Sequence, residues 1–152
     1  MSAVESPFVS VVMPVRNEAG FIARALTAVL AQRWPEDRLE VLVADGMSTD
    51  GTRDIVASFA DVHPNVTIVD NPGRVAPTGL NAAIARAKGD VVVRVDGHCE
   101  IAADYVARCV GHLVVSEVDC VGGPLTTLGS SRVARVIALA MSSRFGVGGS
   151  RF

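Results

Sequence analysis

Apolar runs alternate with amphipathic stretches from the beginning of the chain to about residue 120. The apolar runs are short, continuous and rich in β-branched residues, which is typical of strands that are covered on both faces. The amphipathic stretches repeat apolar residues every three or four positions, which is typical of helices that pack by one face. The alternation predicts an α/β fold with a mostly parallel sheet and helices on both faces.

The predicted elements can be placed by residue number. The strands are expected at 8–15, 39–45, 66–73 and 90–96, with a possible fifth at 118–125. The helices are expected at about 19–32, 53–62, 77–89, 104–115 and 132–141. The glycine-rich tail at 145–152 carries no capping element. We therefore expect residues 1–152 to form a single domain that is incomplete at its C-terminus.

Composition and charge exclude several classes of protein. The net charge of −2 and the scattered arginines give no basic stripe, so we expect no nucleic-acid partner. Cys99, Cys109 and Cys120 lack metal-site spacing, and no signal peptide precedes them. Reduced thiols in a cytoplasmic protein are the expectation. No stretch is long and apolar enough to span a membrane, so membrane association would require segments that this sequence lacks.

Polar side chains follow several of the predicted strands. Glu18 comes after the first strand, Asp45 ends the second, and Asp96 and His98 end and follow the fourth. Ligands of open α/β sheets bind beyond the carboxyl ends of the strands. One acidic residue at such a position is ordinarily a helix cap, but three strands deliver one here. The pattern therefore predicts a binding site at this edge.

The spacing of Asp96 and His98 permits a metal site. Residues two apart in an extended segment point the same way, so a carboxylate and an imidazole can bind one ion. This ligand pair suits Mn²⁺ or Mg²⁺. A strand end without ligand remains the alternative. The chain has neither G-x-G-x-x-G after the first strand nor G-x-x-x-x-G-K-[ST] anywhere, which disfavours dinucleotide dehydrogenases and P-loop nucleotidases.

Four segments together resemble a known family. In chain order they are "VSVVMPVRNEAGFIARAL", "VLVADGMSTDGT", "GLNAAIARAKGD" and "VRVDGHCE". They are similar to the nucleotide-sugar-binding half of family 2 glycosyltransferases, which have the GT-A (Rossmann-like) fold. The motifs "VGGP" and "SSRFGVGGSRF" bring the likeness closer to bacterial exopolysaccharide enzymes of the succinoglycan glucosyltransferase type.

The resemblance implies roles for particular residues. The loop after the first strand would contact the nucleoside, Asp45 would accept a hydrogen bond from uracil, and Asp50 would order its turn. Arg74 is a phosphate or base contact, or equally a solvated loop residue. His98 stands where the family usually has Asp. The implied nucleotide-sugar-binding residues are Pro14, Val15, Glu18, Asp45, Arg74, Asn81 and Asp96, and the implied metal ligands are Asp96 and His98.

The implied reaction is inverting transfer of a hexose from a nucleotide sugar, with a UDP-sugar favoured, during polysaccharide biosynthesis. The acceptor would be a glycan or a lipid-linked glycan, and a full-length protein would work at the cytoplasmic face of the membrane. No residue of the chain is assigned as general base, which we expect beyond Phe152. Two alternatives remain: a non-catalytic nucleotide- or sugar-binding domain, and a metal-dependent nucleotidyltransferase, which "PVRNEAG" disfavours because it lacks a glycine-rich signature with a following lysine.

Overall fold

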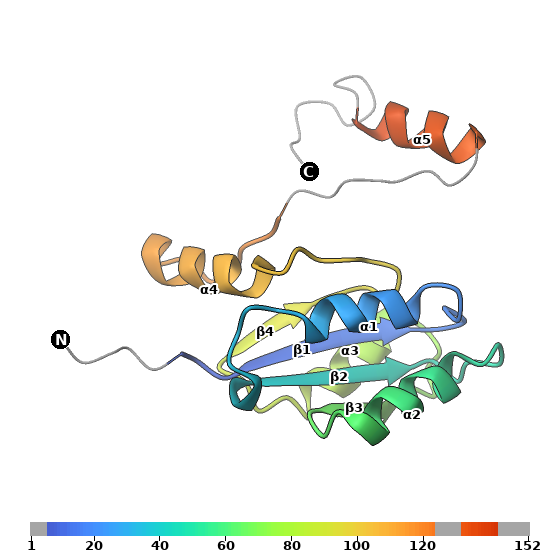
Figure 1. Cartoon of the computed structure of the whole chain (residues 1–152), viewed down its shortest axis with the longest axis horizontal. Coiled ribbons are helices and arrows are strands. Elements are labelled where there is room, and N and C mark those ends of the chain that lie inside the picture. Colours follow the sequence, from blue (N-terminus) through green and yellow to red (C-terminus); the bar gives the residue numbers. More distant parts are fainter. Residues whose placement is uncertain (1–5, 124–131, 143–152) are drawn as a thin grey trace. The chain divides into compact units, whose positions relative to one another are not determined.

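The computed structural model describes residues 6–123 and 132–142, and the chain divides after Val110 into two compact units. Strands and helices alternate in the first unit (Figure 1). The strands are β1 (Val9–Val15), β2 (Leu39–Asp45), β3 (Val66–Asp70) and β4 (Val91–Arg94). The helices are α1 (Ile22–Leu30), the 3-10 helix η1 (Glu36–Arg38), α2 (Thr52–Val62), α3 (Ala76–Ile84), α4 (Tyr105–Ser116) and α5 (Arg132–Ser142). Helix α4 begins in the first unit and continues into the second, and α5 belongs to the second unit.

The four strands form one parallel sheet in the order β3-β2-β1-β4. Val9 at the start of β1 pairs with Leu39 of β2 on one side and with Val91 of β4 on the other. The chain runs outward from β1 to β2 and β3, and then crosses to the opposite side of β1 to form β4. The carboxyl ends of β1 and β4 therefore flank the point where the strand order reverses, which is the usual ligand-binding crevice of such sheets.

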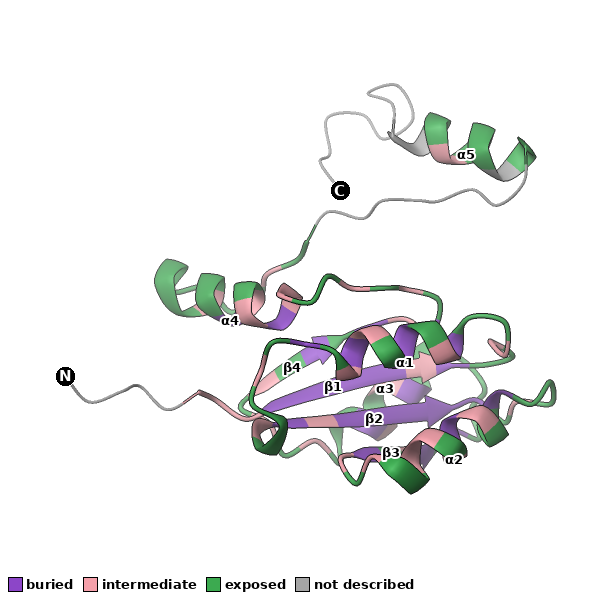
Figure 2. Ribbon diagram, in the orientation of Figure 1, coloured by how far each residue is buried: buried purple, intermediate pink, exposed green. Residues whose placement is uncertain are grey.

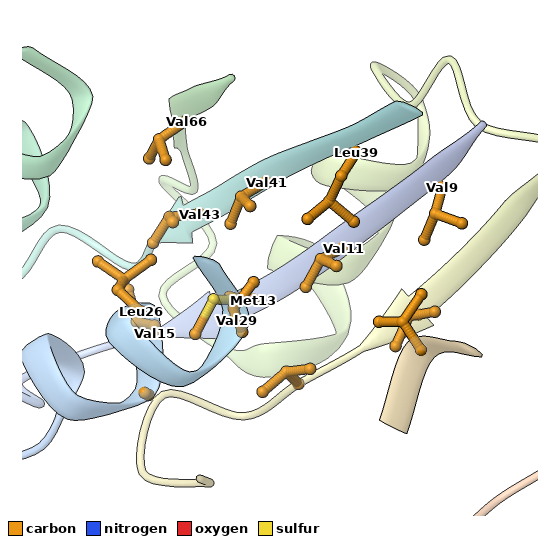
Figure 3. Close-up of a cluster of buried hydrophobic side chains, with 14 of the residues drawn as sticks. Val9, Val11, Met13, Val15, Leu26, Val29, Leu39, Val41, Val43 and Val66 are labelled. Carbon is orange, nitrogen blue, oxygen red and sulfur yellow. The ribbon is translucent and has the colours of Figure 1, made fainter. Parts of the chain in front are cut away.

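Both faces of the sheet are covered, as the sequence predicts. Alternate residues of β1 point to opposite faces. Val11 and Met13 pack in a large buried cluster with α1, α2 and the beginning of α4 (Figure 3). Val12 points the other way and packs with residues of α3. The two central strands, β1 and β2, are almost continuously buried between these layers (Figure 2), which explains their uninterrupted apolar sequences.

One predicted strand is not found among the residues that the structure describes. The expected strand at 118–125 is wrong for residues 118–123, which the structure leaves without regular secondary structure; residues 124 and 125 lie outside the described residues. Val118 is exposed, and Asp119 and the glycine pair at 122–123 are poor strand formers. The final predicted helix is confirmed as α5. None of the described helices is long and apolar enough to cross a membrane.

Candidate functional site

A cleft of about 230 Å³ lies at the carboxyl edge of the sheet. It is lined by the end of β1 and its following loop, by the loop from β3 to α3, and by residues on and after β4. The structure therefore brings together residues more than 75 positions apart in the sequence. Six of the predicted site residues line this cleft: Pro14, Val15, Glu18, Arg74, Asp96 and His98.

A larger and more open hollow, of about 640 Å³, lies at the opposite edge. Phe8, Leu39 and Lys88 are among its lining residues, and they lie at or before the beginnings of strands. None of the residues predicted for the site lines it. Size alone would select this hollow, but six of the predicted site residues line the cleft at the carboxyl edge.

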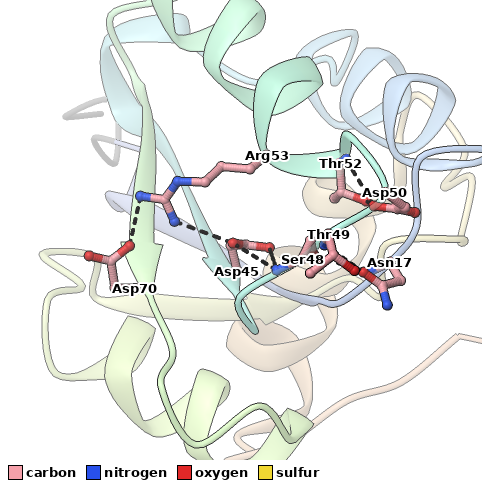
Figure 4. A network of polar contacts seen from close by, with 8 residues as sticks. All are labelled: Asn17, Asp45, Ser48, Thr49, Asp50, Thr52, Arg53 and Asp70. Carbon is pink, nitrogen blue, oxygen red and sulfur yellow. Dashed lines mark hydrogen bonds and ion pairs between the residues drawn. The ribbon is translucent and has the colours of Figure 1, made fainter.

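Glu18 is held in place through its backbone (Figure 4 shows the surrounding network). The Glu18 N–H donates to Thr52 Oγ1 at 2.8 Å, and the Ala19 N–H donates to Asp50 Oδ2 at 3.0 Å. The preceding residue, Asn17, exchanges hydrogen bonds with the turn after β2, where it accepts from the Thr49 N–H at 2.9 Å. The loop after β1 is thus tied to the start of α2, and the predicted ordering role of Asp50 agrees with these contacts.

Asp50 itself has a depressed pKa. The hydrogen bond from the Thr52 hydroxyl is the main cause, and the Ala19 N–H adds to it. Both donors stabilise the ionised carboxylate. The charge on Asp50 therefore contributes to the order of the loop that carries Glu18.

Asp96 is paired with an arginine that the sequence analysis did not select. Arg94 Nε donates to Asp96 Oδ1 at 2.9 Å, and a second guanidinium nitrogen donates to Oδ2 at 3.3 Å. The contact raises the pKa of Arg94, chiefly through the hydrogen bond and then through the charge of Asp96. Arg94 is the last residue of β4 and Asp96 follows two positions later, a spacing that could have indicated the pair.

His98 contacts the acidic residue of the loop after β1. Its Nδ1 lies 3.0 Å from Glu18 Oε1. An ionised carboxylate only accepts hydrogen bonds, so Nδ1 carries the proton, and a neutral ring then keeps a lone pair on Nε2. Metal-binding histidines are commonly oriented in this way by a carboxylate on the other nitrogen.

Gly97 allows the segment between Asp96 and His98 to approach β1. A Cβ at this position would lie 2.8 Å from Val15 Cγ1 and 3.4 Å from Glu18 Cγ. The first distance is shorter than a van der Waals contact, so any side chain would push the segment away. The glycine is therefore what allows both site residues to lie against the end of β1.

The donor set fits a divalent cation. Asp96, His98 and Cys99 can place one ligand atom each within 4.8 Å of one another. Burial is the main cause that raises the pKa of the Cys99 thiol, with the charge of Asp96 as a further cause. A protonated thiol is a poor metal ligand. The carboxylate and the imidazole therefore form the useful pair, and they suit Mn²⁺ or Mg²⁺.

Two predicted site residues do not line the cleft. Asp45 is 1% exposed, and its carboxylate accepts from the Ser48 N–H at 3.2 Å and from Arg53 at 3.3 Å (Figure 4). Asn81 is exposed on α3 and is not among the lining residues. Asp45 instead connects the turn after β2 to α2, through an arginine that also contacts Asp70 at 2.7 Å.

The loop after β3 contributes residues that sequence reasoning missed. Asn71 is 3% exposed, donates to the Val75 carbonyl at 3.0 Å and accepts from the Thr78 hydroxyl at 2.7 Å. These bonds shape the turn that carries Arg74, whose φ is +59°. Arg16 donates to the Arg74 carbonyl at 3.2 Å. The Asn-Pro-Gly sequence indicated a turn, but nothing in it indicated a cleft wall.

Comparison with known sequences identifies a family. The family model described as Glycosyl transferase family 2 matches residues 10–144. The succinoglycan biosynthesis protein ExoA of Rhizobium meliloti is 36% identical over 143 residues, which are 93% of this chain and 43% of that protein. Glycosyltransferase AglE of Haloferax volcanii is 36% identical over 77% of this chain and 39% of its own length. The chain thus spans less than half of these relatives.

Solved structures agree with the fold. The mannosyltransferase PcManGT of Pyrobaculum calidifontis, solved with GDP-Man and Mn²⁺, matches with a TM-score of 0.68 and 32% identity over 90% of this chain and 41% of its own. S. aureus TarS 1-349, solved with UDP, matches with a TM-score of 0.64 and 22% identity over 78% of this chain and 38% of its own. The second likeness shows the fold alone.

Proposed function

Because the chain belongs to glycosyl transferase family 2, we propose that it binds a nucleotide sugar together with a divalent cation in the cleft between β1 and β4. In this proposal it forms the donor-binding part of an inverting hexosyltransferase of polysaccharide biosynthesis. The donor is a UDP-sugar, and the acceptor is a glycan or a lipid-linked glycan. The transfer reaction belongs to a full-length protein at the cytoplasmic face of the membrane.

One observation carries the proposal. Asp96 and His98 come from the segment after β4, Glu18 comes from the loop after β1, and the three line one cleft at the reversal of strand order. This is where open α/β sheets bind their ligands. The relative PcManGT, which shares this fold, was solved with a nucleotide sugar and Mn²⁺.

Each residue has a role in the proposed complex. Asp96 and His98 would hold the cation, and Glu18 would keep the imidazole oriented and reach the ribose. Pro14 and Val15 would form the apolar wall beside the nucleoside. When bound, the cation stabilises the charge that develops on the leaving diphosphate. Arg74 would contact a phosphate or the base, and the exposed Asn81 of α3 would contact the nucleotide sugar from outside the present lining of the cleft.

The preference for one nucleotide base is the most specific part of the proposal. UDP is favoured through the resemblance of the Asp45 segment, and GDP is the competitor, since PcManGT was solved with GDP-Man. Asp45 could contact a base only if the Ser48 turn opened, because its carboxylate is buried. A comparison of UDP with GDP therefore tests the base preference independently of the metal site.

Transfer also needs a group that takes the proton of the acceptor hydroxyl. In the cleft, the carboxylates of Glu18 and Asp96 already contact His98 and Arg94. We therefore seek the general base in the remainder of a full-length protein. If the chain bound the nucleotide sugar but transferred no sugar, it would match the alternative of a non-catalytic nucleotide- or sugar-binding domain.

Isothermal titration calorimetry tests the proposal. UDP, GDP and UDP-glucose are titrated into the chain with Mn²⁺, with Mg²⁺ and with EDTA. The proposal predicts one site per chain that requires a cation and prefers UDP. Equal binding in EDTA would contradict the metal role, and tighter binding of GDP would contradict the UDP preference. No binding to a folded chain would contradict the function.

A further inference from the structure

We propose that Arg94 couples the two ligands of the cleft: it holds Asp96 in the absence of a cation and binds the diphosphate once a cation has taken that carboxylate. The inference rests on the proposed function and adds a residue and a coupling to it. The residues that the family resemblance implies for the site do not include Arg94.

The first step concerns the two oxygens of Asp96. The guanidinium of Arg94 contacts both of them, at 2.9 and 3.3 Å. A cation that coordinates this carboxylate must approach the same oxygens, and it repels the guanidinium that occupies them. Arg94 and a divalent cation therefore compete for Asp96. When no nucleotide is present, Arg94 weakens the binding of the cation.

The second step concerns where the displaced side chain can go. Arg94 lies on β4 and lines the same cleft as Asp96 and His98, and its side chain is 56% exposed. It can therefore turn within the cleft without disturbing the core. A guanidinium presents paired N–H donors that suit phosphate oxygens. The released Arg94 would thus contact the diphosphate that the cation brings.

The two steps predict changes of opposite sign when Arg94 is removed. The cation alone should bind more tightly, because its competitor is gone. The nucleoside diphosphate with saturating cation should bind more weakly, because a phosphate contact is gone. A residue that merely stabilised the loop would shift both affinities in the same direction.

The test uses Arg94→Met, which keeps an aliphatic side chain and removes the charge. Binding of Mn²⁺ alone is followed by the electron paramagnetic resonance signal of free Mn²⁺, and binding of UDP at saturating Mn²⁺ by calorimetry. Loss of a charge-assisted hydrogen bond should weaken UDP about tenfold. Mn²⁺ alone should bind several-fold more tightly. Arg108→Met is the matched control, since Arg108 is an exposed arginine paired with Asp104 outside the cleft.

A second variant guards against a folding defect. Arg94→Lys keeps the charge but loses the two-pronged contact, so it should change both affinities in the same directions as Arg94→Met and by less. Unchanged or weaker binding of Mn²⁺ alone in both variants would overturn the coupling while leaving the donor site intact. Failure of the wild-type chain to bind UDP with Mn²⁺ would overturn the proposed function, and the coupling with it.

Discussion

The imidazole Nδ1 of His98 lies 3.0 Å from Oε1 of Glu18, a contact between residues 80 positions apart in the sequence. The contact joins the loop after β1 to the segment after β4, and it fixes which ring nitrogen of His98 is free. In the proposed site, the other ring nitrogen would bind the cation at the place where the family resemblance implies an aspartate. The orientation of the ring depends on Glu18.

Glu18→Gln should weaken the binding of Mn²⁺ in the presence of UDP by about tenfold, because loss of an orienting carboxylate typically costs this much. The measurement is a calorimetric titration of Mn²⁺ at saturating UDP. Glu100→Gln is the control, since Glu100 pairs with Arg24 on the surface and does not line the cleft. Equal effects of the two substitutions on Mn²⁺ affinity would contradict a role of Glu18 in cation binding.

His98→Asp should keep metal-dependent binding of UDP and shift the preference from Mn²⁺ toward Mg²⁺, because Mg²⁺ prefers oxygen ligands. His98→Ala should lose affinity for both ions. The readout is the ratio of UDP dissociation constants measured with the two ions. His112→Ala, a change at an exposed histidine of α4, is the control. The ligand role would be wrong if His98→Ala kept the wild-type ratio and affinities.

Gly97→Ala should destabilise the chain by about 1–3 kcal/mol and weaken UDP binding, because the new Cβ would meet Val15 at 2.8 Å. Chemical denaturation and calorimetry measure the two effects. Gly111→Ala is the matched control: a Cβ there has no neighbour within 4 Å. In a helix this second change should stabilise by about 0.5–1 kcal/mol. Wild-type stability and affinity in Gly97→Ala would contradict the close approach.

Asp50 should contribute to stability in a pH-dependent way. Its pKa is lowered in the folded chain, so its charge stabilises the fold above the ordinary aspartate pKa of about 3.9. This contribution is lost as the pH falls through the lowered value. Asp50→Asn should therefore flatten the acid limb of a plot of unfolding free energy against pH. Asp61→Asn, at an exposed position of α2, is the control for the removal of a carboxylate. An equal change of the acid limb in both variants, or an unchanged acid limb in Asp50→Asn, would contradict the assignment.

Much of the fold could be predicted because local patterns determine it. The central strands β1 and β2 are apolar on both faces, and each strand is followed by a helix with one apolar face, so alternation alone indicates a parallel sheet. The predicted strand failed over the described residues 118–123 because isolated valines beside Asp119 and two glycines do not make a strand.

The candidate site was predictable only in part. Asp96, His98 and Glu18 could be found because each follows a strand at the carboxyl edge. Asp45 also ends a strand, yet its side chain turns to Ser48 and Arg53 and is buried. Position at a strand end does not specify which way a side chain turns. Arg94 was missed because an arginine in a strand looks like a solvent-facing residue until its partner is known.

The most direct test of the account is thermal unfolding of the wild type and of Asp96→Ala with UDP, with and without Mn²⁺. A ligand that binds only the folded chain, at about 100 times its Kd, adds about 2.7 kcal/mol, which raises the Tm measurably. We predict that UDP stabilises the wild type only when Mn²⁺ is present, and that the effect disappears in Asp96→Ala. Equal stabilisation of both proteins, or none of a folded wild type, would contradict a metal-dependent nucleotide site at Asp96.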